Sequence, residues 1–142
     1  MLGEIELDPA SCEQANRTVK AKVFYDQSTD GLTKRWNART VFLNPPYCKQ
    51  GNTSNQELWT AKLLAEYKAG RVKEAIVLLT NATETTWFHR LTEFSVCFVK
   101  GRIDFTTPNG KRGGATKGSI FVYLGKRPAV FSQVFRRFGV VK

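Results

Sequence analysis

The stretch TVFLNPPY, residues 40–47, decides how this sequence folds, because a short strand ends there in a rigid tetrapeptide. Two consecutive prolines fix φ and remove backbone N–H donors, so the chain leaves the strand in a defined direction. The sequence then predicts a helix over residues 55–69, since Ser54 and Glu57 form a capping box ahead of apolar residues at helical spacing. The apolar run AIVLL, residues 75–79, is typical of a strand covered on both faces. A helix followed by a buried strand indicates a βαβ crossover and a parallel sheet.

The segments on either side extend this α/β pattern. Residues 4–7 alternate polar and apolar side chains and predict a short strand that stops at Asp8. Elsewhere we expect a helix from Ser11 or Cys12 to Ala21, a short helix near residues 83–89, and strands at residues 23–25, 95–99, 103–105 and 119–124. The tail, residues 131–138, places its phenylalanines on one helical face, which core packing explains better than ligand binding.

The tetrapeptide supplies groups that could hold a planar amine for methylation. Such an amine is a poor nucleophile because its lone pair is delocalised, so a catalyst needs fixed acceptors that draw the lone pair out. Asn44 offers a side-chain carbonyl, Pro45 offers a backbone carbonyl, and Tyr47 offers a flat face on which an extruded base could stack. The simpler interpretation is that the prolines form a rigid strand exit and that Tyr47 is an aromatic at its rim.

The charge of the chain indicates an anionic partner. A formal net charge of +10, with a pI near 9.8, is large for a small domain, and nucleic acid is the leading candidate. The alternatives are a membrane surface or ordinary solvated charge. The glycine-rich segment 106–118 carries Lys111, Arg112 and Lys117 and could contact phosphates as a basic hairpin tip, or it could be a surface loop whose cations face water.

Length and composition set further expectations. A chain of 142 residues and 16.0 kDa fits a single domain spanning residues 1–142. The sequence contains no apolar stretch near the length of a membrane span, and its first residues lack the features of a signal peptide, so we expect a cytoplasmic protein that does not enter membranes. Three separated cysteines and one histidine, without a C-x-x-C pair, argue against a metal site or a disulfide framework.

Several blocks of sequence together resemble a known family. In chain order they are LDPAS (residues 7–11), DGL (30–32) followed by Trp36, FLNPPY (42–47), TTWFH (85–89), GRIDF (101–105) and GSIFV (118–122). This ordered set is similar to the phage-type DNA N6-adenine methyltransferase (Dam) family and covers nearly the whole chain. The resemblance implies a Rossmann-like S-adenosylmethionine-dependent methyltransferase fold, with a mostly parallel sheet and one antiparallel strand near the C-terminus.

The resemblance also implies an activity and a site. The activity would be S-adenosylmethionine-dependent methyl transfer to the N6 amine of adenine in DNA, with the target base flipped against a catalytic set formed by Asn44, Pro45, Pro46 and Tyr47. By the same resemblance, Asp8, Pro9, Ala10 and Ser11 would lie near the methionine portion of the donor, in place of the usual glycine-rich loop. Asp30 would lie at its adenosine end, and its simpler interpretation is a turn aspartate.

Nucleic-acid contacts are expected from a set of basic and aromatic residues: Lys49, Trp87, His89, Arg102, Lys111, Arg112 and Lys117. Two of them have plain structural alternatives. Trp87 and Phe88 form a pair that is more often found in a core, and Arg102 could form an intramolecular salt bridge. We do not expect His89 to be a general base, because N6 transfer only removes a proton that becomes acidic after methylation.

Many relatives carry a segment ahead of the first strand that covers the donor. We expect this chain to lack it. Such a short form could bind the donor weakly, gain the missing wall from a second copy of the chain or a partner subunit, or have lost catalysis and kept nucleic-acid binding. Two other functions stay open: a catalytically degenerate methyltransferase fold that binds nucleic acid, and an amide methyltransferase acting on protein glutamine. An active DNA enzyme of this kind would work in the cytoplasm of a bacterial cell or a phage-infected host.

Overall fold

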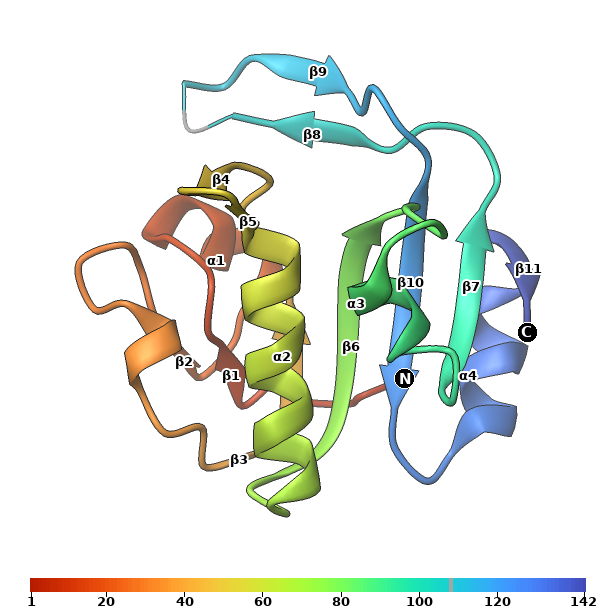
Figure 1. Ribbon diagram of the computed structural model, residues 1–142. Helices are drawn as coiled ribbons and strands as arrows, with labels where there is room; N and C mark the ends of the chain where they lie inside the picture. The colour runs from red at the N-terminus through yellow and green to blue at the C-terminus, as the bar shows by residue number, and fades with distance from the viewer. Residues whose placement is uncertain (108) are drawn as a thin grey trace.

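The computed structural model describes residues 1–107 and 109–142, so Pro108, within the predicted hairpin tip, lies outside the described residues. Its centre is a seven-stranded sheet with the strand order β11-β7-β10-β6-β3-β1-β2 (Figure 1). The strands are β1 (Leu7–Asp8), β2 (Val23–Phe24), β3 (Ala38–Leu43), β6 (Val72–Thr80), β7 (Ser95–Val99), β10 (Ser119–Leu124) and β11 (Gly139–Val141).

The strand directions confirm a mixed α/β protein with a mostly parallel sheet. Strand β1 pairs in parallel with β2 and β3, and β3 pairs in parallel with β6. Strand β10 is antiparallel to both β6 and β7, which makes it the antiparallel strand expected near the C-terminus. The edge strand β11 is also antiparallel, to β7, so the expectation of a single antiparallel strand was wrong. A three-residue strand held only by a neighbour distant in sequence leaves no periodic signal.

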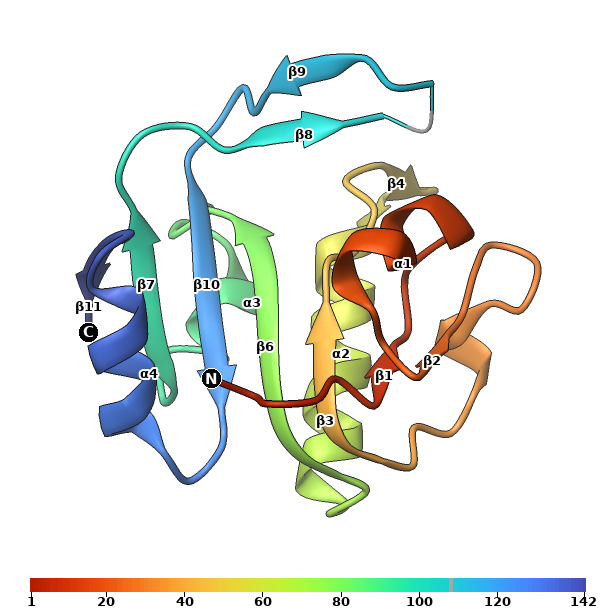
Figure 2. The same ribbon diagram turned by 180° about the vertical axis from the view of Figure 1, so that it is seen from behind.

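Helices cover both faces of the sheet. They are α1 (Glu13–Val19), the short 3₁₀ turn η1 (Gly31–Thr33), α2 (Asn55–Lys68), α3 (Thr86–His89) and α4 (Pro128–Phe135). Figure 1 shows α2 and α3 on one face, and Figure 2, from behind, shows α1 and α4 on the other. Within the described ranges, no helix is long and apolar enough to cross a membrane.

Strand β6 is buried on both faces, as its apolar run predicts. Ala75, Val77 and Leu79 belong to the core cluster beneath α2, whereas Ile76 belongs to the cluster beneath α4. The crossover from β3 through α2 to β6 is the predicted βαβ unit. Its helix begins as expected, because the Ser54 hydroxyl accepts a hydrogen bond from the Gln56 N–H at 3.2 Å.

Two segments differ from the sequence-based expectations. Strand β8 (Asp104–Thr106) lies where a strand was predicted, but it pairs with β9 (Arg112–Gly114), a strand that the sequence did not predict, in a hairpin separate from the central sheet. This hairpin extends over the edge of the sheet at which β3 and β6 end (Figure 2), close to a small ribbon formed by β4 (Lys49–Gln50) and β5 (Thr53–Ser54). The C-terminal helix covers residues 128–135 rather than 131–138, so Phe138 falls outside it.

The two ends of this phenylalanine series should differ in their contribution to stability. Phe131 is fully buried and stacks on Tyr123 and Phe135, whereas Phe138 is 42% exposed. We expect Phe131→Ala to lower the free energy of unfolding by about 3–5 kcal/mol, measured by urea denaturation, through loss of burial and creation of a cavity. The matched control Phe138→Ala should cost less than about 1 kcal/mol. Equal losses in the two variants would contradict this assignment of the core.

Candidate functional site

Two cavities lie at the edge of the sheet where the parallel strands end. The first, here called the Pro9 cavity, has a volume of about 690 Å³ and is lined by residues that follow β1, β2 and β3, among them Pro9, Ala10, Ser11, Asp26, Gln27, Asn44 and Pro46. The second, the Tyr47 cavity, has a volume of about 830 Å³ and is lined among others by Tyr47, Lys49, Thr80, Trp87, Phe105 and Lys117. Both volumes are in the range of cofactor and ligand sites.

One segment forms a wall that borders both cavities. Pro46, Cys48 and Gln50 line the Pro9 cavity, whereas Tyr47 and Lys49, the residues between them, line the Tyr47 cavity. The double proline fixes φ directly after β3, and the chain then bends at Tyr47 and Cys48 before it enters β4. The tetrapeptide therefore lies between two spaces, each large enough for a ligand.

A hydrogen bond joins the two sides of this wall. The Tyr47 hydroxyl donates to Asn44 Oδ1 at 3.0 Å, although Asn44 lines one cavity and Tyr47 the other. Burial raises the pKa of Tyr47 to about 12, so its hydroxyl keeps the proton it donates. The ring stays 44% exposed and contacts the edge of Phe105 with centroids 5.6 Å apart. Pro45 is buried and is not among the residues that line either cavity.

Asp8 ends strand β1 and immediately precedes Pro9, but it is not itself among the residues that line the Pro9 cavity. Its side chain is only 2% exposed, and its Oδ1 accepts the Ala10 N–H at 3.3 Å. Desolvation raises the pKa of this carboxyl to about 6, and hydrogen bonds from Ser11 and from the Ala10 backbone oppose the shift without cancelling it. Asp8 thus organises the turn that carries Pro9, Ala10 and Ser11 into the cavity, and it changes charge close to neutral pH.

Asp30 lines the same cavity from a strained turn. Its φ is +50°, which is uncommon for a residue other than glycine, and its Oδ1 accepts the Leu32 N–H at 3.2 Å. The next residue packs so closely that a Cβ on Gly31 would lie 2.1 Å from the Pro9 carbonyl oxygen. Only glycine fits at this contact between the two turns.

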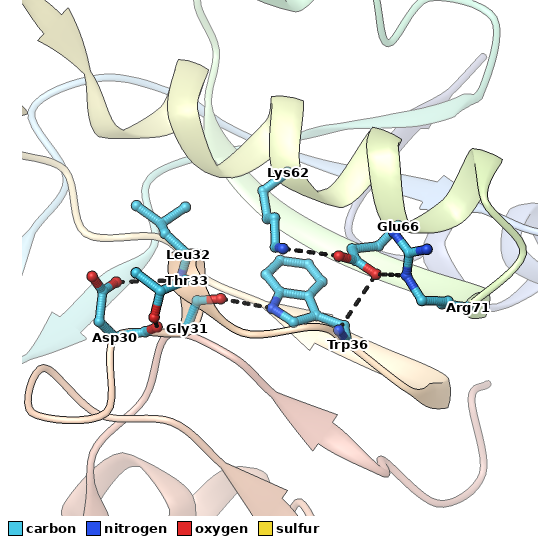
Figure 3. Close-up of polar contacts among 8 residues, drawn as sticks. All are labelled: Asp30, Gly31, Leu32, Thr33, Trp36, Lys62, Glu66 and Arg71. Atoms are coloured by element: carbon cyan, nitrogen blue, oxygen red, sulfur yellow. Dashed lines mark hydrogen bonds and ion pairs between the residues drawn. The ribbon is translucent and has the colours of Figure 1, made fainter.

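Helix α2 holds this turn in place through Trp36, as Figure 3 shows. The Trp36 indole N–H donates to the Gly31 carbonyl at 2.8 Å, and its backbone N–H donates to Glu66. Glu66 is also paired with Lys62 at 2.8 Å and with Arg71. Desolvation would raise the pKa of Glu66, but hydrogen bonds from Arg71 and Lys62 outweigh it and hold that pKa below its usual value. The buried carboxylate therefore stays ionised and fixes the Trp36 backbone.

Helix α2 is also tied to the end of β6. Gln56 donates its side-chain N–H to the Thr80 hydroxyl at 2.9 Å and accepts the Thr80 backbone N–H at 2.8 Å. Both residues line the Tyr47 cavity, so this reciprocal pair fixes one side of its wall. Because the two residues are far apart in sequence, no local pattern could have revealed the pair.

The residues expected to contact nucleic acid fall into two groups. Lys49, Trp87 and Lys117 line the Tyr47 cavity, although Trp87 is also a core residue, only 6% exposed. The others are exposed and line neither cavity: His89 in α3, Arg102 ahead of β8, and Lys111 and Arg112 on the β8–β9 hairpin. His89 Nε2 lies 2.8 Å from the Thr83 carbonyl oxygen, a local contact within the loop that precedes α3.

Sequence reasoning missed several residues that line the cavities. Asp26 lies two residues after the end of β2, so the position of strand ends could have identified it. Hydrogen bonds from Ser28 and Thr29 hold the pKa of its carboxyl below the usual value. Asn55 and Trp59, on α2, also line the Pro9 cavity, but they had been interpreted only as part of an amphipathic helix. In the described part of the chain, no group of three or more His, Cys, Asp or Glu side chains could hold a metal ion.

Comparison with known proteins identifies the family. A family model described as DNA N-6-adenine-methyltransferase (Dam) matches residues 2–138, nearly the whole chain. The chain therefore belongs to this family, a family of DNA adenine methyltransferases, and the resemblance drawn from the ordered blocks is confirmed. A search of curated proteins found no match.

The buried carboxyl of Asp8 makes a pH-dependent contribution to stability. Its folded pKa of about 6 lies above the ordinary 3.8, so the cost of its charge is absent below about pH 4 and complete above about pH 6. We expect the free energy of unfolding of Asp8→Asn, relative to that of wild type, to be about 2 kcal/mol higher at about pH 7.5 than at about pH 4.5. Urea unfolding of both proteins at the two pH values measures this change. A difference between the two proteins that does not change with pH would contradict the raised pKa.

Proposed function

We propose that this member of the Dam family transfers a methyl group from S-adenosylmethionine to the N6 amine of adenine in DNA, with the donor in the Pro9 cavity and the flipped base in the Tyr47 cavity. The observation that carries the proposal is the wall between the cavities, in which Asn44 lines one side and Tyr47 the other. A transfer reaction needs two ligands to meet at one point, and this wall is where they would meet.

We assign the fold as Rossmann-like and the chain as one domain. The strand order supports the first assignment, because parallel strands β2, β1, β3 and β6 are followed by an antiparallel β10 inserted before β7. The second is supported by Arg127, which pairs with Glu74 at 2.6 Å and donates to the Met1 carbonyl at 3.1 Å. One side chain thus links the start of the chain, the middle of the sheet and the last helix.

The Pro9 cavity fits the donor in size and in chemistry. Its volume of about 690 Å³ suits a nucleoside-sized cofactor, and ligands of open α/β sheets bind beyond the carboxyl ends of the strands. Asp26 and Asp30 present carboxylates that can accept from ribose hydroxyls or an exocyclic amine, while Pro9, Ala10 and Ser11 would lie near the methionine portion. When bound, S-adenosylmethionine supplies a methyl carbon activated by an adjacent sulfonium.

The residues of the wall would prepare the amine for attack. Asn44 Oδ1 accepts one hydrogen bond from Tyr47 and keeps a second lone pair, which can accept an N6–H of adenine. The Tyr47 ring would stack on the base. The amine loses a proton only after it is methylated, when that proton is acidic, so a strong base is not needed. This agrees with the position of His89 outside the lining of both cavities.

The basic hairpin would hold the DNA. It extends over the edge of the sheet where the Tyr47 cavity lies, and Lys117, at its return to β10, lines that cavity together with Lys49. Lys111 and Arg112 are exposed on the hairpin, and Arg102 precedes it, so these side chains can reach phosphates. We further propose that a second copy or a partner subunit covers the Pro9 cavity, and that the protein works in the cytoplasm, where it meets bacterial or phage DNA.

Removal of the Asn44 acceptor should abolish most of the chemistry. We expect Asn44→Ala to lower the methyl-transfer rate by about 100-fold or more, because a fixed hydrogen-bonding group at a reacting centre contributes about that much. The measurement is mass analysis of nucleosides from DNA incubated with labelled S-adenosylmethionine. DNA affinity and the unfolding transition should be close to those of wild type.

Tyr47 offers a matched pair of variants for the same assay. Tyr47→Phe removes the hydrogen bond to Asn44 but keeps the stacking face, so it should retain more activity than Tyr47→Ala. Methylation that is unchanged in Asn44→Ala would refute the role of Asn44. Label that appears in protein rather than in DNA would replace the adenine assignment by an amide methyltransferase.

Phosphate contact by Lys117 should appear in the salt dependence of DNA binding. We expect Lys117→Ala to weaken binding by about 5- to 10-fold at about 0.1 M salt and to reduce the slope of log K against log salt by about one. Fluorescence anisotropy with a labelled duplex measures both. Lys73→Ala is the control, because Lys73 lies near the start of β6, at the opposite end from Thr80. An equal effect of the two variants would show that only overall charge matters.

A further inference from the structure

Two polar atoms in the wall of the Pro9 cavity are buried without a partner. Within the described part of the chain, Asn55 Oδ1 and Trp59 Nε1 are the buried side-chain polar atoms that lack a hydrogen-bond partner. Asn55 is 2% exposed and Trp59 is 6% exposed, and both side chains line this cavity. Buried polar groups are nearly always paired, so two unpaired atoms in one cavity wall indicate that a ligand pairs them.

Helix α2 presents the two side chains together. They are four residues apart in the helix, so they lie on the same face, one turn after the other. The other polar atom of Asn55 is already used, because its Nδ2 donates to Cys48 Sγ at 3.0 Å. Trp59 is fixed by stacking on Trp36, with centroids 6.2 Å apart. The cavity therefore meets one acceptor and one donor on a rigid support.

The neighbours of Asn55 and Trp59 place this pair at the part of the Pro9 cavity that borders the tetrapeptide, residues 44–47. Asn55 is bonded to Cys48, the residue directly after the tetrapeptide, through both its backbone and its side chain. Trp59 lies beside the point at which Gly31 packs on Pro9, because a Cβ built on Gly31 would lie 3.1 Å from Cη2 of the Trp59 ring. The pair thus spans from the tetrapeptide to the turn after β1.

Resting on the proposed function, we propose that Asn55 and Trp59 bind the amino-acid end of the methyl donor: Asn55 Oδ1 accepts from its α-ammonium group, and Trp59 Nε1–H donates to its α-carboxylate. The amino-acid chain is attached to the same sulfur as the methyl group, which must lie beside the tetrapeptide. An α-amino acid carries a donor and an acceptor on one carbon, which matches one acceptor and one donor on one helix face. The adenosine end would lie towards Asp26, Gln27 and Asp30, which line the same cavity.

The test compares two ligands that differ in the amino-acid end. S-adenosylhomocysteine carries that end, whereas 5′-methylthioadenosine lacks it, and isothermal titration calorimetry measures the affinity of each for the full chain. We expect Trp59→Phe and Asn55→Leu each to weaken S-adenosylhomocysteine binding about tenfold, because each removes one hydrogen bond to a charged group. Both variants should leave 5′-methylthioadenosine binding unchanged. Lys73→Ala, near the start of β6 and at the opposite end of that strand from Thr80, is the control and should change neither affinity.

A second measurement does not depend on how well the variants fold. The chain has three tryptophans, so wild type labelled with ¹⁵N gives three indole N–H signals in NMR spectra. The Trp59 signal is the one missing from the spectrum of Trp59→Phe. If that variant does not fold, variants of Trp36 and Trp87 identify the Trp59 signal by elimination. We expect S-adenosylhomocysteine to shift this signal strongly and 5′-methylthioadenosine to shift it little.

The outcomes separate this inference from the proposed function. Wild type that binds neither ligand would contradict the proposed function itself. Wild type that binds S-adenosylhomocysteine, with unchanged affinity in both variants and an unshifted Trp59 signal, would overturn the role of the pair alone. Equal weakening of both ligands would show that the pair binds the adenosine end, and it would overturn the assignment to the amino-acid end.

Discussion

The parallel pairing of β3 with β1 on one side and with β6 on the other is the constraint on which the rest of this structure depends. Parallel strands end at the same edge of a sheet, so the residues that follow β1, β3 and β6 must meet there. Asp8, Asn44 and Thr80 come from distant parts of the sequence, yet each ends or follows one of these strands. Both cavities lie at this edge, where the segments that follow the parallel strands come together.

The wall between the cavities follows from a second constraint, the rigid exit of the chain from β3. The double proline fixes φ immediately after the strand, the chain bends at Tyr47 and Cys48, and neighbouring residues of this segment line different cavities. Rigid neighbours support this wall on both sides. The Gln56–Thr80 pair fixes the start of α2 against β6, and Trp36, held by Glu66, fixes the turn that presses Gly31 against Pro9. Such fixed surroundings are what preorganised catalysis requires, since groups that must reorganise lose part of their effect.

Charge is arranged differently in the interior and on the surface. The buried carboxylate of Glu66 and the partly buried carboxylate of Glu74 are each paired with an arginine, which confines them to structural networks. The β8–β9 hairpin, which carries the exposed residues Lys111 and Arg112, lies above the edge of the sheet at which β3 and β6 end. Two further cations of the chain, Lys49 and Lys117, line the Tyr47 cavity.

The sequence by itself determined the features that depend on local chemistry or on an ordered set of motifs. These are the strand that ends in the tetrapeptide, the capped helix α2, the buried strand β6, the burial of Phe131 and the family. Only the tertiary structure decided which residues face one another across the sheet edge. It turned Asn55 and Trp59 towards the Pro9 cavity, joined Gln56 to Thr80, and added β9 as the partner of β8 in a hairpin outside the central sheet. The physical reason is that such contacts depend on strand register and on the packing of segments far apart in the chain, and neither leaves a periodic trace in the sequence.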